Sequence, residues 1–244
     1  MMKIEKRPLP VNILLILLVP IVGLALGVVL TSALGVASVY SNLVINGCFL
    51  TAVALLITIF KPSRAELGLQ VIPAQMRRHV VLALLVLGLY LLFYLFVIRI
   101  SGLKVWDTAV LWSLLTNLIV VITEEVYFRG LLYGFVQKRW SARAALIASS
   151  ILFGLFHAQQ GLRGILTKLF TGWLWGSVRY ASGMIFLLIF PVHYAFNTVW
   201  LLFAGNWDNP PTWAVYALPA AEFLLGLLFV AMFERKGGCD AGQS

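Results

Sequence analysis

The chain has 244 residues, of which 61% are hydrophobic and only 11% carry a charged side chain. Soluble domains are about half apolar and about one quarter charged, so this composition excludes an ordinary soluble domain and indicates an integral membrane protein. A net charge of +9 would suggest nucleic-acid binding in a soluble protein, but in a membrane protein it indicates Lys and Arg on cytoplasmic loops. We therefore expect membrane lipid around the protein and no nucleic-acid partner.

The apolar segments predict an all-α polytopic bundle of about eight transmembrane helices, which forms one integral membrane domain over residues 1–244. In chain order the predicted spans are 11–34, 40–60, 80–100, 109–135, 144–158, 165–181, 184–204 and 214–233. The fifth and sixth spans are short and interrupted by polar residues, which suggests that neighbouring helices shield them. The sequence shows no internal repeat of the kind that many secondary transporters carry.

The first predicted span has a second interpretation as a signal peptide. Lys3, Lys6 and Arg7 form a basic start, and residues 35–37 are an acceptable cleavage site. However, the apolar run has about twenty residues or more, whereas the apolar region of a signal peptide has about 7–15. We therefore expect an uncleaved transmembrane helix.

Basic side chains orient the predicted spans. When the spans alternate in direction, clusters at residues 3–7, 61–78 and 138–143 fall on the same side of the membrane. Lys and Arg are enriched on cytoplasmic loops, so we expect both termini of this multi-pass protein to be cytoplasmic, in a bacterial cytoplasmic membrane. We also expect His79 to be solvated in a basic loop, and Lys168 and Arg179 to extend toward an interface.

Two adjacent carboxylates interrupt the fourth predicted span. Glu124 and Glu125 are followed by Arg129 inside an otherwise apolar run from about 109 to 135. Ionisable groups cost on the order of 2.5–3.5 kcal/mol each on insertion into a membrane helix, so they are rare there and usually functional. The three residues therefore mark a candidate site.

Three polar residues in later spans reach a similar depth: His157, His193 and Asn197. Counted from the cytoplasmic end of each span at about 1.5 Å per residue, the two acids lie roughly 15 Å deep, His157 about 20 Å, His193 about 13 Å and Asn197 about 20 Å. These depths differ by roughly 7 Å in a core about 30 Å thick. The sequence thus predicts one site in the middle to cytoplasmic half of the bilayer.

Spacing within the helices separates the candidate roles. Glu125 and Arg129 are four residues apart with the acid first, the favoured order for an intrahelical ion pair. Glu124 points about 100° away and lacks that partner, so we expect it to face the cavity as a general base. His193 and Asn197, also four residues apart, present two donors on one helix face, which suits stabilisation of an oxyanion.

The same residues form three motifs: Glu124-Glu125-x-x-x-Arg129, Phe153-x-x-x-His157 and His193-x-x-x-Asn197. In this order they resemble the motifs of the CAAX-prenyl-endopeptidase and bacteriocin-processing family, also called Abi or type II CAAX proteases. The resemblance implies an eight-helix intramembrane glutamic endopeptidase with its catalytic core at about 109–204. It also implies that Glu124, helped by His157, activates water against a peptide carbonyl, and that His193 and Asn197 hold the oxyanion. We expect Phe153 to pack against the site.

Alternatives to a metal-free peptidase remain open. Glu124, His157 and His193 could bind zinc as two histidines and a carboxylate, although no HExxH spacing is present and we expect no cofactor. The polar groups could instead relay protons in a transporter, or the chain could be a non-catalytic immunity or scaffold protein. The expected partner is a peptide or protein substrate with a membrane-associated segment, whose identity and prenylation the sequence does not select.

Overall fold

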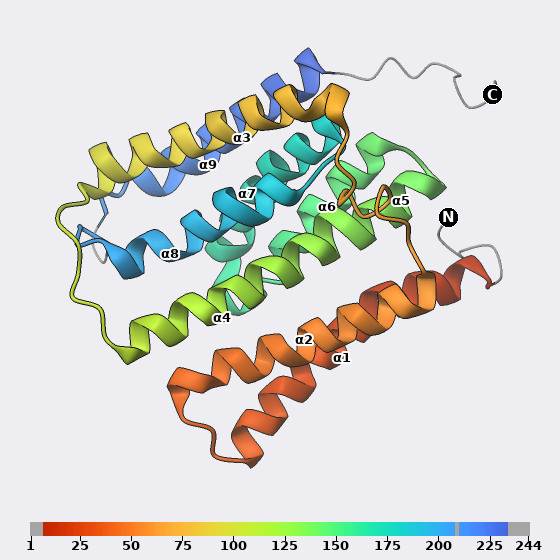
Figure 1. The fold of residues 1–244 in the computed structure, drawn as a ribbon, viewed down its shortest axis with the longest axis horizontal. Helices are drawn as coiled ribbons and strands as arrows, with labels where there is room; N and C mark the ends of the chain where they lie inside the picture. Colours follow the sequence, from red (N-terminus) through yellow and green to blue (C-terminus); the bar gives the residue numbers. More distant parts are fainter. Residues whose placement is uncertain (1–6, 208–209, 234–244) are drawn as a thin grey trace.

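The fold is a bundle of helices that run roughly along one direction (Figure 1). The computed structural model describes residues 7–207 and 210–233, and their regular secondary structure is helical. The α-helices are α1 (Leu9–Ala33), α2 (Ser38–Phe60), α3 (Pro73–Phe93), α4 (Thr108–Glu124), α5 (Tyr133–Arg139), α6 (Ala142–Leu155), α7 (Gly161–Ser182), α8 (Tyr194–Leu202) and α9 (Ala214–Met232). The π-helical segments are η1 (Tyr94–Ile98) and η2 (Glu125–Leu132), and η4 (Leu188–His193) is a helical segment with a kink at Phe190, whose backbone is extended. The prediction of an all-α membrane helix bundle is confirmed.

Five helices among the described residues are long and apolar enough to cross a membrane, or six if one bent pair counts as a span. The five are Leu9–Ala33, Tyr40–Phe60, Pro73–Ile98, Thr108–Arg139 and Ala214–Met232. The bent pair is Ala142–Leu155 with Ala158–Ser182, which has an angle of 53° at its break, and Leu188–Leu202 is a shorter apolar helix. The short, polar-interrupted character expected of the fifth and sixth spans thus corresponds to this bent pair.

Helices α6 and α7 pack closely because glycine lies at their contact. A Cβ atom on Gly154 would stand 2.7 Å from the carbonyl oxygen of Ile165, and one on Gly172 would stand 3.2 Å from Cα of Ser150. Small residues allow this backbone approach, which stabilises helix pairs in membranes through van der Waals contact. Helix α6 has only 14 residues, about 21 Å of helix. Its C-terminal end therefore falls short of crossing a hydrocarbon core of about 30 Å.

Helix α3 begins at Pro73, earlier than the predicted span, because proline fits the first helical position, where its missing N–H has no helical partner. His79 therefore lies within the helix and is buried, and the expectation of a solvated side chain is wrong. Its Nδ1 is 2.9 Å from Ser182 Oγ, and its Nε2 accepts a hydrogen bond from the Leu187 N–H at 3.2 Å. His79 thus connects α3 to the segment after α7.

Arg179 is also buried, so the expectation that it extends toward an interface is wrong. Its guanidinium donates to the backbone carbonyl groups of Ala65, Glu66 and Gly183. It therefore attaches the connection between α2 and α3 to the C-terminal end of α7.

Helices α1 and α2 form a hairpin that lies along one side of α4 (Figure 1). Pro20 lies inside α1 and has no N–H, so the carbonyl group of Ile16, four residues earlier, loses its helical donor. The hydroxyl of Tyr127 in η2 donates to this carbonyl oxygen at 2.8 Å. Phe49 of α2 packs edge-on against the Tyr127 ring. The same tyrosine thus joins both helices of the hairpin to the rest of the bundle.

Candidate active site

The two adjacent acids lie where the fourth span changes its helical form. Helix α4 ends at Glu124 and η2 begins at Glu125, within one continuous span from Thr108 to Arg139. His193 is the last residue of η4, a segment that is kinked at Phe190, and lies directly before α8. Single π-helical turns are rare in proteins and are frequent at functional sites. The local backbone therefore sets these residues apart from the regular helices around them.

Glu125 and Arg129 form the predicted intrahelical ion pair. Arg129 Nη1 is 3.1 Å from Glu125 Oε1, and the two side chains have 1% and 0% of their surface exposed. The Arg129 guanidinium carbon lies 4.1 Å from the ring centroid of Phe153 and 5.3 Å from that of Trp175. Such cation–π contacts stabilise a desolvated cation. Phe153 thus packs against the site through Arg129, and the supporting role of these residues stays a prediction.

His193 is held from both sides of its ring. Its Nδ1 lies 2.9 Å from Glu125 Oε1, which is an acceptor, so Nδ1 carries the hydrogen. In a neutral imidazole Nε2 is then an acceptor, and it lies 3.1 Å from the amide nitrogen of Asn197. The ring of Trp175 lies against His193, with 4.2 Å between the centroids. In its neutral form His193 therefore accepts from Asn197, and only a protonated ring would give the two donors expected from the sequence.

Glu124 and His157 face each other across a short gap. His157 Nδ1 donates to the carbonyl oxygen of Phe153 at 2.7 Å, which leaves Nε2 of a neutral ring as an acceptor. Glu124 Oε1 is 3.9 Å from this Nε2, and Glu124 Oε2 is 3.7 Å from Nε2 of His193. These distances are too long for direct hydrogen bonds. Glu124 is thus the acid without a close charged partner, as the spacing predicts, and all four candidate catalytic residues come together.

The four residues line a cavity of about 720 Å³. Its wall includes polar side chains from three elements: Asn42 and Asn46 of α2, Ser113, Thr116 and Asn117 of α4, and Lys168 of α7. Lys168 was expected to extend toward an interface; instead it lines the cavity with Glu124 and Asn197. The sequence motifs did not include these polar residues, although the spacing of Ser113, Thr116 and Asn117 places the three on one face of α4.

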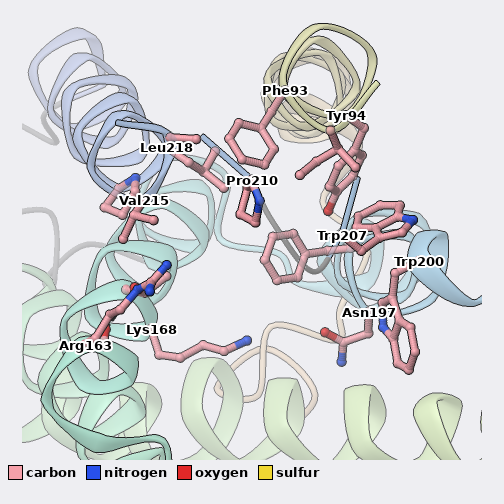
Figure 2. A pocket seen from close by; sticks show the side chains of 15 residues that line it. Phe93, Tyr94, Arg163, Lys168, Asn197, Trp200, Trp207, Pro210, Val215 and Leu218 are labelled. Atoms are coloured by element: carbon pink, nitrogen blue, oxygen red, sulfur yellow. Dashed lines mark hydrogen bonds between the residues drawn. The ribbon is translucent and has the colours of Figure 1, made fainter. Parts of the chain in front are cut away.

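A second cavity of about 500 Å³ adjoins the first and shares Lys168, Asn197 and Trp200 with it. Figure 2 shows Lys168 and Asn197 pointing toward each other, with aromatic side chains such as Phe93 and Trp207 around the space. The site thus continues into a largely apolar chamber between the ends of α3, α8 and α9.

Glu222, in the last span, is buried and fully paired. Its carboxylate accepts from the Tyr90 hydroxyl at 2.8 Å and from the Thr171 hydroxyl at 3.0 and 3.1 Å. The Tyr90 oxygen in turn accepts from the indole N–H of Trp175 at 2.8 Å. Because the ring of Trp175 lies against His193, this chain of hydrogen bonds fixes the position of the indole ring on which the imidazole packs.

Within the described part of the chain, no three or more His, Cys, Asp and Glu side chains are grouped so that they could hold a metal ion. The nearest approach to such a group is Glu124 with the Nε2 atoms of His157 and His193. Zinc ligands lie about 2.0–2.2 Å from the metal. Binding of a zinc ion here would therefore require a rearrangement of the two histidines and the carboxylate around the metal.

One comparison with known proteins finds a match, and its range contains the candidate site. No curated protein matches the chain. The family model described as type II CAAX prenyl endopeptidase Rce1-like matches residues 106–199, a segment that contains Glu124, Glu125, Arg129, Phe153, His157, His193 and Asn197. Over this segment, which holds the whole candidate active site, the chain is similar to the type II CAAX prenyl endopeptidase Rce1-like family.

Proposed function

We propose that the protein is an intramembrane glutamic endopeptidase that needs no metal, in which Glu124 and His157 activate a water molecule. One observation carries the proposal: Glu124 Oε1 and His157 Nε2 are both acceptors and lie 3.9 Å apart beside a large cavity. Two acceptors cannot bond to each other without a shared proton. A water molecule between them can donate one hydrogen to each, which raises the electron density on its oxygen.

The reaction follows from this arrangement. The water oxygen attacks the carbonyl carbon of the peptide bond, and Glu124 takes a proton from it, so that a tetrahedral intermediate forms. Glu124 then gives the proton to the amide nitrogen as the C–N bond breaks. The products are a carboxylic acid and an amine, and the glutamate returns to its starting state. Glu124 therefore acts first as general base and then as general acid.

The negative oxygen of the intermediate needs a donor on the opposite side. The amide nitrogen of Asn197 has two hydrogens; one points to His193 Nε2 at 3.1 Å, which leaves the other for the oxyanion. His193 holds this amide in place and is itself held by Glu125. A fixed donor of this kind lowers the barrier, since it is oriented before the charge develops.

The substrate is a peptide or protein with a membrane-associated segment. The cavity lies among membrane-spanning helices, so a bond reaches Glu124 only as part of a chain that enters the bundle. The matched family is one of CAAX prenyl endopeptidases. A non-catalytic scaffold has no need of two half-buried acceptors aimed at one space, which favours the enzyme.

The test is Glu124→Gln, which keeps the side-chain volume and removes the base. We expect the rate at which the purified protein hydrolyses a peptide library, monitored by mass spectrometry, to fall by about 10²–10⁴-fold. The control is Asp107→Asn, the same chemical change on the same helix, because Asp107 accepts from the Val110 N–H as N-cap and asparagine caps equally well. Wild-type rates in Glu124→Gln would show that another group is the base.

Zinc dependence is the alternative that the same site allows. If Glu124 and His157 activate water directly, protein that has been exhaustively chelated and exchanged into metal-free buffer keeps its peptidase activity. The measurement is turnover together with the zinc content of the purified protein. Loss of turnover on chelation, rescue by stoichiometric zinc, and loss of bound zinc in both His157→Ala and His193→Ala would replace the proposal with a zinc mechanism.

A further inference from the structure

The active-site cavity is closed at one end of the bundle. Next to Glu124 along the chain, η2 and α5 are buried from residue 127 to residue 136, and no side chain of this stretch except Phe128 lines the cavity. The ring of Phe128 packs edge-on against Phe153 and Phe156. These aromatic contacts separate Glu124 from the end of the bundle where α5 ends and α6 begins.

The cavity extends the other way, along the first half of α2 and along α4 from Glu124 back to Ser113. Its lining on α4 runs from Ser113 to Glu124, and its lining on α2 runs from Asn42 to Phe49. Asn42, about one turn into α2, belongs to the lining and is exposed. The cavity therefore reaches the protein surface at the end of the bundle where α2 and α4 begin.

The polar side chains on this path indicate that it is wet. Asn42 and Asn46 are one helical turn apart on α2, and Ser113 and Asn117 are one turn apart on α4. Polar residues within membrane spans usually face a water-filled cavity or another polar group. A wet path would supply both the attacking water and an extended, hydrated peptide.

The basic clusters lie at the opposite end of the bundle. Figure 1 shows that α1 begins, α2 ends, α3 begins, α5 ends and α9 ends on one side. The helix ends and connections on that side carry Arg7, Lys61, Arg64, Arg77, Arg78, Lys138, Arg139 and Arg143. The cavity side carries fewer: Arg99, Lys104 and Arg163. An excess of Lys and Arg marks the cytoplasmic side of a membrane protein.

We infer that the peptide bond reaches Glu124 from the non-cytoplasmic side of the membrane. That the entering group is a peptide bond rests on the proposed function. The direction of access depends only on where the cavity opens and on which end of the bundle carries the basic residues. The substrate class is then a peptide segment that is displayed at the outer face of the membrane and enters between α2, α4 and α8. A substrate that approached from the cytoplasm would meet the closed end of the cavity, where aromatic side chains pack together.

The experiment measures access to the cavity with a membrane-impermeant, charged thiol reagent. Cys48→Ser and Cys239→Ser remove the native thiols, and single cysteines are placed by Asn46→Cys and Ser113→Cys in the cavity. Ser63→Cys and Ser141→Cys report on the basic end. Leu50→Cys and Leu115→Cys are matched controls, because these residues lie on the same helices, outside the cavity lining, with exposed side chains.

In intact bacterial cells we expect labelling of the two cavity cysteines, at a rate about tenfold above the lipid-facing controls, whose thiols do not ionise in lipid. Ser63→Cys and Ser141→Cys should react only after permeabilisation. If the cavity cysteines also react only after permeabilisation, or if Ser63→Cys reacts in intact cells, access is from the cytoplasm and the inference is wrong. Labelling needs no turnover and should be the same in Glu124→Gln. A failure to find hydrolysis would therefore overturn the proposed function and leave the measured access direction standing.

Discussion

At the scale of single residues, two adjacent carboxylates have different surroundings because the helix turns them apart. Glu125 contacts Arg129 and His193 and is inaccessible to solvent. Glu124 faces the cavity, where Nε2 atoms of two histidines lie 3.7 and 3.9 Å away. The chain thus uses one acid to keep a cation and an imidazole in place and exposes the other to the reacting space.

This division predicts opposite effects of the same substitution. Glu125→Gln leaves Arg129 without its charge partner and weakens the bond to His193 Nδ1, so we expect lower thermal stability. Breaking a buried ion pair by removing one partner costs about 3–5 kcal/mol. The measurement is the midpoint of thermal unfolding in detergent, with Glu124→Gln as the matched variant that should keep its midpoint. An unchanged midpoint for Glu125→Gln with selective loss of turnover would show that the roles of the two acids are reversed.

At the scale of elements, the sequence predicted the helices well and their irregularities poorly. Hydropathy located α1, α2 and α9 because long apolar runs report the membrane directly. It gave no indication of the π-helical η2 or of the kink at Phe190 in η4, since such irregularities depend on tertiary contacts as well as on local composition. The depth estimate still brought His157 and His193 together with Glu124, because a few residues of altered pitch shift a side chain by only a few ångströms.

The close contact of α6 with α7 fixes the position of His157. Gly154 is three residues before it, and the His157 N–H donates to the Gly154 carbonyl oxygen at 3.0 Å. In Gly154→Ala the new methyl group would stand 2.7 Å from the Ile165 oxygen and 3.0 Å from Leu169 Cβ. Overpacking of this kind costs about 1–3 kcal/mol, so we expect a lower unfolding midpoint and a lower kcat.

Gly88→Ala is the control for this contact, because a Cβ atom at Gly88 in α3 meets nothing within 4 Å. There the gain in helix propensity, up to about 1 kcal/mol, should leave stability equal or slightly higher. Equal midpoints and equal kcat for Gly154→Ala and the wild type would mean that the helix pair separates without cost and does not position His157.

At the scale of the whole molecule, the sequence predicted which end of the bundle is basic, but it did not predict where the cavity opens. The basic clusters are local in the chain and can be counted from residues 61–78 and 138–143. The opening depends on which side chains of α2, α4 and α7 face each other, and this is a property of packing. The role of Lys168 was missed for the same reason, since a lone lysine in a span is usually expected to reach toward water.

The attachment of the α1–α2 hairpin is the last feature that a whole-molecule view makes testable. The hairpin forms one wall of the cavity, and Tyr127 joins it to η2 by donating to the Ile16 carbonyl oxygen that Pro20 leaves without a helical donor. Tyr127→Phe should leave a buried acceptor unsatisfied, which costs about 1–3 kcal/mol. We expect a lower midpoint of thermal unfolding for this variant than for the wild type.

A double-mutant cycle tests the physical reason for this loss. Pro20→Ala supplies an N–H that can bond to the Ile16 carbonyl oxygen within α1, so that the tyrosine hydroxyl is no longer needed there. Tyr127→Phe should therefore lower the midpoint clearly in the wild-type background and much less in the Pro20→Ala background. The effect of losing the proline ring itself cancels in this comparison, because it is present in both members of the second pair. An equal loss in the two backgrounds would mean that Tyr127 stabilises the hairpin through its ring packing on Phe49 and not by satisfying the carbonyl group that Pro20 exposes.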